Sequence, residues 1–104
     1  MTANSLYDSI TTMKTSNKKA RQLVATRAAF KGSNTFGQTH SNGVYAVYSY
    51  GVHFPMYAYI GGRWYGNQDK YSSSTSKHQG QLHPPYGEEI KWVSTQGLKD
   101  LIAK

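Results

Sequence analysis

Lys77 and His78 stand side by side in a segment rich in hydroxyl residues, a combination that can cleave a phosphodiester without a metal. A histidine serves as general base, and a lysine stabilises the charge on a pentacoordinate phosphate. Tyr71 and Ser76 add hydroxyl groups, but Asp69 is the only carboxylate nearby. A metal-independent nuclease that uses His78 and Lys77 is therefore one hypothesis. Its alternative is a helix capped by Ser or Thr that carries both side chains into solvent.

Positive charge dominates the chain, with 12 Lys and Arg against 5 Asp and Glu and a net charge of +7. Most of it lies in residues 1–31, which hold six basic residues and only Asp8 as an acid. Such a basic segment is typical of proteins that bind polyanions, nucleic acid above all, although a solvated N-terminus is the alternative. In a helix, neighbouring basic residues would point in different directions around the axis. The sequence therefore does not indicate a recognition helix that inserts into a DNA groove. The candidate phosphate contacts are Lys14, Lys18, Lys19, Arg21, Lys31 and Arg63.

Three tyrosines form a second candidate surface. Tyr45, Tyr57 and Tyr59 alternate with small and apolar residues, which places them on one face of a predicted sheet. Cross-strand tyrosines can form a stacking platform for nucleobases, and Arg63 would add a phosphate contact or a cation–π partner. The alternative is that these rings pack under helices, because only 17 of the 104 residues are Leu, Ile, Val or Phe. A core built from so few aliphatic side chains needs aromatic surface.

Several kinds of site are excluded by composition and spacing. The chain has no Cys, which rules out a disulfide scaffold, a zinc ribbon and a thiol enzyme. His40, His53, His78 and His83 do not have the spacing of a metal site. No phosphate-binding glycine loop and no serine-hydrolase elbow is present, so we expect no cofactor and no metal. No apolar run is long enough for a membrane span or a signal peptide, which predicts a cytoplasmic protein without membrane contact.

The residue pattern of the N-terminal segment predicts helices. Residues 4–13 carry apolar side chains at helical spacing, and Ser16 can cap a second helix whose apolar face continues to Ala28. Gly32 follows as a stop signal. We therefore divide the single domain into a basic helical segment, residues 1–31, and a compact α+β body, residues 32–104.

Strand signals follow Gly32. Asn42-Gly43 predicts a type I′ hairpin, and Gly61-Gly62 predicts a second tight turn. Hydroxyl residues 72–76 predict an edge strand that passes at Thr75 or Ser76 into a short helix ending near Leu82. The expected strands are 35–40, 44–50, 56–60, 63–65 and 90–94, followed by a C-terminal helix capped at residue 94 or 95. The predicted fold is α+β, with an antiparallel sheet of four to five strands and the N- and C-terminal helices packed on one face.

Residues 30–83 resemble a family of small phage-encoded domains of unknown function. The likeness rests on Val-Tyr-Ser-Tyr-Gly at positions 47–51, on Pro55 after it, and on Lys70-Tyr71-Ser72 with Thr75-Ser-Lys-His-Gln79. In that family a hairpin leads through a Trp-containing strand to the same kind of segment. The resemblance implies a protein made by a phage in the cytoplasm of a bacterial host, and it implies no activity.

Three functions follow from these patterns. The first is a binding module, not an enzyme, that associates with nucleic acid through the N-terminal Lys and Arg residues and the tyrosine face. The second is an inhibitor or modulator that binds a bacterial host protein directly. The third is the nuclease that uses His78 and Lys77. Nothing in the sequence indicates an oligomeric state.

Overall fold

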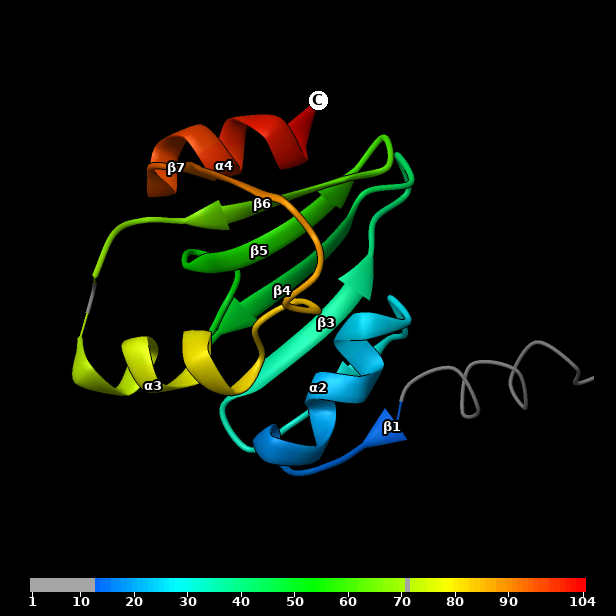
Figure 1. Ribbon diagram of the computed structural model, residues 1–104, viewed down its shortest axis with the longest axis vertical. Coiled ribbons are helices and arrows are strands. Elements are labelled where there is room, and N and C mark those ends of the chain that lie inside the picture. Colours follow the sequence, from blue (N-terminus) through cyan, green and yellow to red (C-terminus); the bar gives the residue numbers. More distant parts are fainter. Residues whose placement is uncertain (1–12, 71) are drawn as a thin grey trace, which may run out of the picture.

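One mixed β-sheet with helices on both sides makes up the molecule (Figure 1). The structure, a computed structural model, describes residues 13–70 and 72–104, and the helix expected over residues 4–13 lies almost wholly outside this range. Within it are three helices and seven strands. Their bounds are β1 Met13–Lys14, α2 Asn17–Ala25, β2 Phe30–Lys31, β3 Thr35–Thr39, β4 Tyr45–Ser49, β5 Pro55–Ile60, β6 Arg63–Asn67, α3 Ser73–Gln81, β7 Ile90–Val93 and α4 Thr95–Ala103.

The strands lie in the sheet in their sequence order, β1 to β7. Neighbours from β2 to β6 are antiparallel, whereas β1 with β2 and β6 with β7 are parallel pairs. A parallel pair needs a crossover connection, which α2 and α3 supply. The predicted α+β class is confirmed. The prediction of four to five antiparallel strands is matched only roughly. Strands β2 to β6 are antiparallel, but the two-residue strands β1 and β2 leave no alternating pattern to recognise, and α3 turns the chain so that β7 runs parallel to β6.

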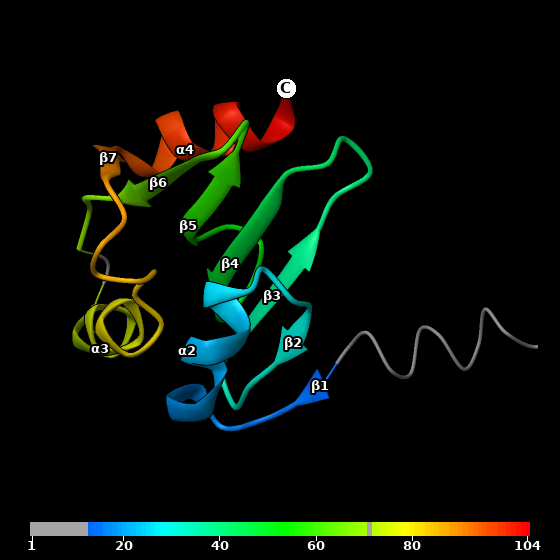
Figure 2. The same ribbon diagram turned by 45° about the vertical axis from the view of Figure 1, so that its right-hand side comes forward.

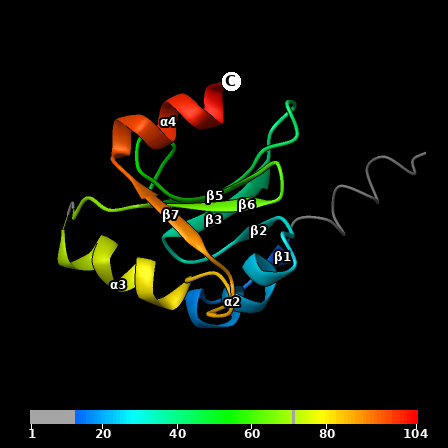
Figure 3. The same cartoon turned by 45° about the horizontal axis from the view of Figure 1, so that its top comes forward.

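Helices cover both faces of the sheet (Figures 2 and 3). On one face, α2 and the end of α3 bury Ala20, Val24 and Leu82 against the larger core cluster. On the other, α4 buries Leu98 and Ile102 against a second cluster. The prediction that the helices share one face is wrong, because β7 delivers the chain to the side opposite α2 before α4 begins.

Serine caps start all three helices that the structure describes. The hydroxyl oxygens of Ser16, Ser72 and Ser94 each accept the backbone N–H three residues on, which satisfies a donor that the first helical turn leaves free. For Ser16 and Ser94 this confirms the prediction. Ser72 corrects it: a reciprocal capping box with Thr75 starts α3, so residues 73–76 are helical and the predicted hydroxyl edge strand is wrong.

Helix α2 ends earlier than its apolar pattern predicts. Arg27 adopts a left-handed φ of 56°, its N–H donates to the Val24 carbonyl, and the Ala28 N–H donates to the Leu23 carbonyl. This is the hydrogen-bond pattern of a Schellman motif. Because α2 ends before Arg27, this residue does not lie on the apolar face of the helix. Its guanidinium instead lies 4.3 Å from the centroid of the Tyr59 ring.

The two hairpin turns differ from each other. Both Gly61 and Gly62 have positive φ, as a type I′ turn requires. In the β3–β4 hairpin only Gly43 does, with a φ of 87°, so the type I′ prediction for Asn42-Gly43 is wrong. There the Asn42 carboxamide accepts the Val44 N–H and donates to the Ile102 carbonyl, which ties the hairpin to α4.

Candidate nucleic-acid interface

Within the described residues, the least covered surface is the β1–β3 half of the sheet face on which α4 lies. Helix α4 packs mainly on β5 and β6, and no other described helix lies over β1 to β3 on that side (Figures 1 and 2). Lys14 and Lys31 are register partners in β1 and β2, so they point to the same side. Since Phe30 is buried in the core on the α2 side, strand alternation directs Lys31, and Lys14 with it, to the uncovered side.

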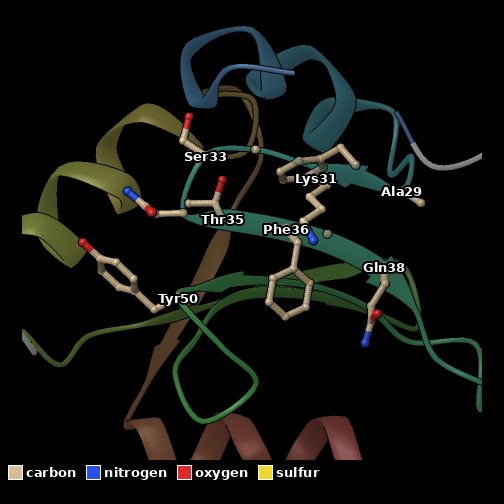
Figure 4. Close-up of a pocket in the computed structure, with 11 residues that line it drawn as sticks. Ala29, Lys31, Ser33, Thr35, Phe36, Gln38 and Tyr50 are labelled. Atoms are coloured by element: carbon tan, nitrogen blue, oxygen red, sulfur yellow. The ribbon is translucent and has the colours of Figure 1, made fainter. Parts of the chain in front are cut away.

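A depression of about 480 Å³ lies beside Lys31 (Figure 4). Lys31, Phe36 and Gln38 line it and point to the same side of the sheet, whereas the ring of Tyr50, which also borders the depression, turns toward α3. The half-buried Phe36 ring stacks on Tyr48, with ring centroids 4.8 Å apart and planes 19° apart. The depression therefore offers an aromatic ring, an amide and a primary amine on one surface. We call Lys14, Lys31, Phe36 and Gln38 the open face.

Tyr50 is held at the surface by an unusual backbone conformation. Its φ of 68° lies in the left-handed region, which a bulky aromatic residue rarely adopts. Its N–H donates to the Asn34 carbonyl at 2.7 Å, and its ring leans on His78 with centroids 5.4 Å apart. The side chain nevertheless remains 55% exposed. Strain of this kind is common at ligand sites, where the surrounding structure holds a side chain ready for contact.

The sequence between Asp8 and Asp69 carries charges of one sign only. Between Asp8 and Asp69 the chain has no Asp or Glu, and it has seven Lys and Arg residues, a number equal to the whole net charge of +7. The remaining basic and acidic residues cancel. No acidic neighbour in sequence therefore offsets Lys14 or Lys31, and long-range attraction acts on anions.

The predicted cations do not gather in one place. Lys14 and Lys31 meet on the open face, while Lys19 is exposed on α2, which covers the other face, and the side chain of Lys18 lies outside the description. Arg63 is exposed beside the β5–β6 turn, in another part of the sheet.

Arg21 has a structural role instead of a free charge. Its Nε donates to the Gln81 carbonyl at 3.1 Å and its Nη2 to the Gly80 carbonyl at 2.8 Å. The last carbonyls of a helix lack partners within it and carry partial negative charge. The guanidinium also lies 5.8 Å from the centroid of the Tyr86 ring. Arg21 thus joins α2 to the C-terminal end of α3 and lies apart from Lys14 and Lys31.

The tyrosine platform is not available for stacking. Tyr45 and Tyr57 are buried beneath α2 and α3, and Tyr59 is half-buried against Trp64 and below Arg27. The Tyr45 hydroxyl donates to the Ala28 carbonyl, and the Tyr57 hydroxyl donates to the Gln79 carbonyl, each at 2.8 Å. Burial raises the pKa of both hydroxyls far above their ordinary value. These three rings are core, which is the alternative that the low aliphatic content favours.

His78 is likewise built into the core, which speaks against the nuclease hypothesis. The residue is 5% exposed, and its Nδ1 is 2.8 Å from the buried Ser49 hydroxyl oxygen. Lys77, the next residue on α3, is exposed. A general base must reach the proton that it abstracts, and a ring enclosed between β4 and α3 does not present that access.

Burial gives His78 a measurable signature in stability. Desolvation, with the charge of Lys77 second, lowers its pKa below the ordinary 6.5, so the unfolded chain takes up this proton at a higher pH than the folded chain does. The free energy of unfolding should therefore fall as the pH drops below about 6.5. Urea unfolding at about pH 7.5 and about pH 5.5 measures this loss. His78→Gln should reduce it, whereas His53→Gln, at an exposed position, should not; equal losses in both variants would contradict the assignment.

The open face was not predicted, although Lys14 and Lys31 were. Phe36 and Gln38 alternate with buried Thr35 and Gly37, but this signal is short, and the sheet neighbours that align Phe36 with Lys31 come from a two-residue strand. Only the strand register brings these residues onto one surface.

Comparison of the chain with protein-family models, with curated proteins and with solved structures finds no match in any of the three. The resemblance of residues 30–83 to phage-encoded domains stays a prediction. In residues 13–70 and 72–104, no helix has the length and apolarity needed to cross a bilayer. The same part of the chain holds no group of three or more His, Cys, Asp or Glu side chains that could bind a metal ion.

Proposed function

We propose that the protein binds single-stranded nucleic acid across the open face. The observation that carries this proposal is the juxtaposition of Lys14 and Lys31, paired in register, with the aromatic ring of Phe36, the register partner of Lys31 in β3. Lysines neutralise backbone phosphates and release counterions, and aromatic rings stack on unpaired bases. An uncovered sheet face is a surface on which several nucleotides can lie extended.

A single strand fits this surface better than a duplex does. Readout of a duplex needs a helix or a narrow ribbon that enters a groove, and the open face is part of a broad sheet. Stacking on Phe36 requires a base that is already unpaired. The setting that we propose, a phage module in the cytoplasm of a bacterial host, rests on the sequence resemblance alone.

The test replaces both lysines of the open face. We expect Lys14→Gln with Lys31→Gln to weaken binding of a fluorescent single-stranded oligonucleotide and to reduce the slope of log K against log salt by about 1.4. The reduction follows from two phosphate contacts, each contributing about 0.7 on single strands. Fluorescence anisotropy across a salt series measures both quantities.

The matched control is Lys91→Gln with Lys104→Gln, which removes the same charge at exposed positions where basic and acidic residues balance. This pair should leave the slope nearly unchanged. Equal effects of the two pairs would show that only overall charge matters, and the open face would then not be the site. A duplex that competes as well as the single strand would remove the stacking part of the proposal.

A further inference from the structure

A second cavity lies on the opposite face of the sheet, between α3 and the strands β6 and β7, of which β7 is the edge strand. Its volume is about 410 Å³, within the range of small-molecule sites. Tyr57, His83 and Trp92 contribute aromatic lining, and Lys70, Ser76 and Gln79 contribute polar lining. Neither the open face nor its lysines take part, so an inference about this cavity does not depend on the proposed function.

The aromatic rings stand close around the cavity. The Trp92 centroid is 6.2 Å from that of Tyr57 and 6.4 Å from that of His83, and the Tyr57 and His83 centroids are 5.8 Å apart. Gly66 makes room for the indole, because a Cβ there would come within 2.6 Å of Trp92 Cζ3. Even so, Trp92 is 47% exposed, so part of its ring is free to contact a ligand. Such walls favour a flat, apolar-faced molecule.

Gln79 supplies an unused hydrogen-bond acceptor. The residue is 6% exposed, and its Nε2 donates to the Asn67 carbonyl at 2.9 Å. A carbonyl accepts but does not donate, so this bond assigns the amide orientation and leaves Oε1 as the other atom. Oε1 is buried and has no hydrogen-bond partner. A buried acceptor without a partner is costly, and a ligand N–H that reaches it after a small shift of the side chain would remove that cost.

We propose that this cavity binds a nucleobase that carries an exocyclic amino group, with its phosphate near Lys70. The ring system stacks beside Trp92, the amino group donates to Gln79 Oε1, and the exposed Lys70 ammonium at the rim attracts the anion. The base comes from a free nucleotide or from a residue within a strand. A comparison of adenosine monophosphate with an adenine trinucleotide distinguishes these two sources.

The test uses the fluorescence of Trp92. The chain has two Trp residues, and Trp64 is buried, so a base stacked beside Trp92 should quench the emission of this residue in a saturable way. We expect quenching by adenosine monophosphate and about tenfold weaker binding of purine riboside monophosphate, which lacks only the amino group. Tenfold corresponds to one hydrogen bond of ordinary strength. Tighter binding of the trinucleotide would identify a strand as the source, and equal binding a free nucleotide.

Variants complete the test. Lys70→Gln should weaken binding of adenosine monophosphate severalfold and leave adenosine unaffected, whereas Lys91→Gln, also exposed, should change neither. Quenching should disappear in Trp92→Phe, which keeps an aromatic ring over Gly66. Absence of saturable quenching, equal affinity for purine riboside monophosphate, or quenching that persists in Trp92→Phe would each overturn the proposal. Circular dichroism of each variant confirms that the fold is retained.

Discussion

Replacing Tyr57 with alanine is expected to lower the free energy of unfolding by about 3–5 kcal/mol, the usual cost of deleting a buried aromatic side chain. Tyr57 is 1% exposed and sits in the core cluster that joins the sheet to α2 and α3. Its ring contacts His83 and Trp92, and its hydroxyl donates to the Gln79 carbonyl. Because the truncation removes packing and a hydrogen bond together, the loss should be a large part of the stability of so small a domain. Urea unfolding followed by circular dichroism measures it.

Two further tyrosine variants separate burial from residue type. Tyr57→Phe keeps the ring and removes the hydroxyl, so it should cost about 1–3 kcal/mol, the penalty for a buried carbonyl that loses its donor. Tyr86→Ala, at a side chain that is 73% exposed, should change stability by no more than about 1 kcal/mol. It removes only the stacking of the ring on His83 and the cation–π contact with Arg21. If Tyr57→Ala lowered the free energy of unfolding no more than Tyr86→Ala does, the assignment of Tyr57 to the core would be wrong.

Gly37→Ala is expected to lower the free energy of unfolding by about 1–3 kcal/mol, the typical cost of overpacking a core. A Cβ at Gly37 would lie 2.5 Å from Phe30 Cε1 and 2.6 Å from the Tyr45 hydroxyl oxygen. Phe30 is buried, and the Tyr45 hydroxyl is held by the Ala28 carbonyl, so neither can move aside freely. Glycine at position 37 therefore leaves the space on β3 that the Phe30 and Tyr45 side chains occupy.

The matched control is Gly80→Ala in α3. A Cβ at Gly80 meets no atom within 4 Å, and alanine has the higher helix propensity, so this change should stabilise the protein by about 0.5–1 kcal/mol. Opposite signs for the two substitutions, measured by thermal and urea unfolding, are the expected result. A neutral Gly37→Ala would mean that β3 and β2 pack less tightly than described.

Features with a local cause were predictable. Ser16 and Ser94 cap helices because a hydroxyl at that place satisfies a free N–H of the first turn, and this chemistry is written in a few adjacent residues. Gly61 and Gly62 form their turn because both adopt positive φ. The same local chemistry misled at residues 72–76, where a hydroxyl run typical of an edge strand serves instead as a reciprocal helix cap.

Features that depend on distant partners were not predictable. The parallel pairs at both edges of the sheet join strands separated by a helix, and β1 and β2 have two residues each. Arg21 is a residue type that often contacts phosphate, and it lies in the basic N-terminal segment. In the structure it donates to carbonyls at the end of α3, about sixty positions along the chain. A basic residue at the surface and a basic residue that joins two helices look alike until the fold places their partners.

The sequence by itself determined the amount of positive charge, the stretch from Asp8 to Asp69 that holds it without an acid, and the need for an aromatic core in a chain with so few aliphatic residues. The tertiary structure alone decided which aromatics form that core. Tyr45 and Tyr57 face α2 and α3 and are buried, whereas Phe36 points to the other side of the sheet, where α4 covers it only in part, and stays half-buried. The physical reason is that alternation along a strand divides side chains between two faces, but burial of either face depends on where helices from other parts of the chain pack.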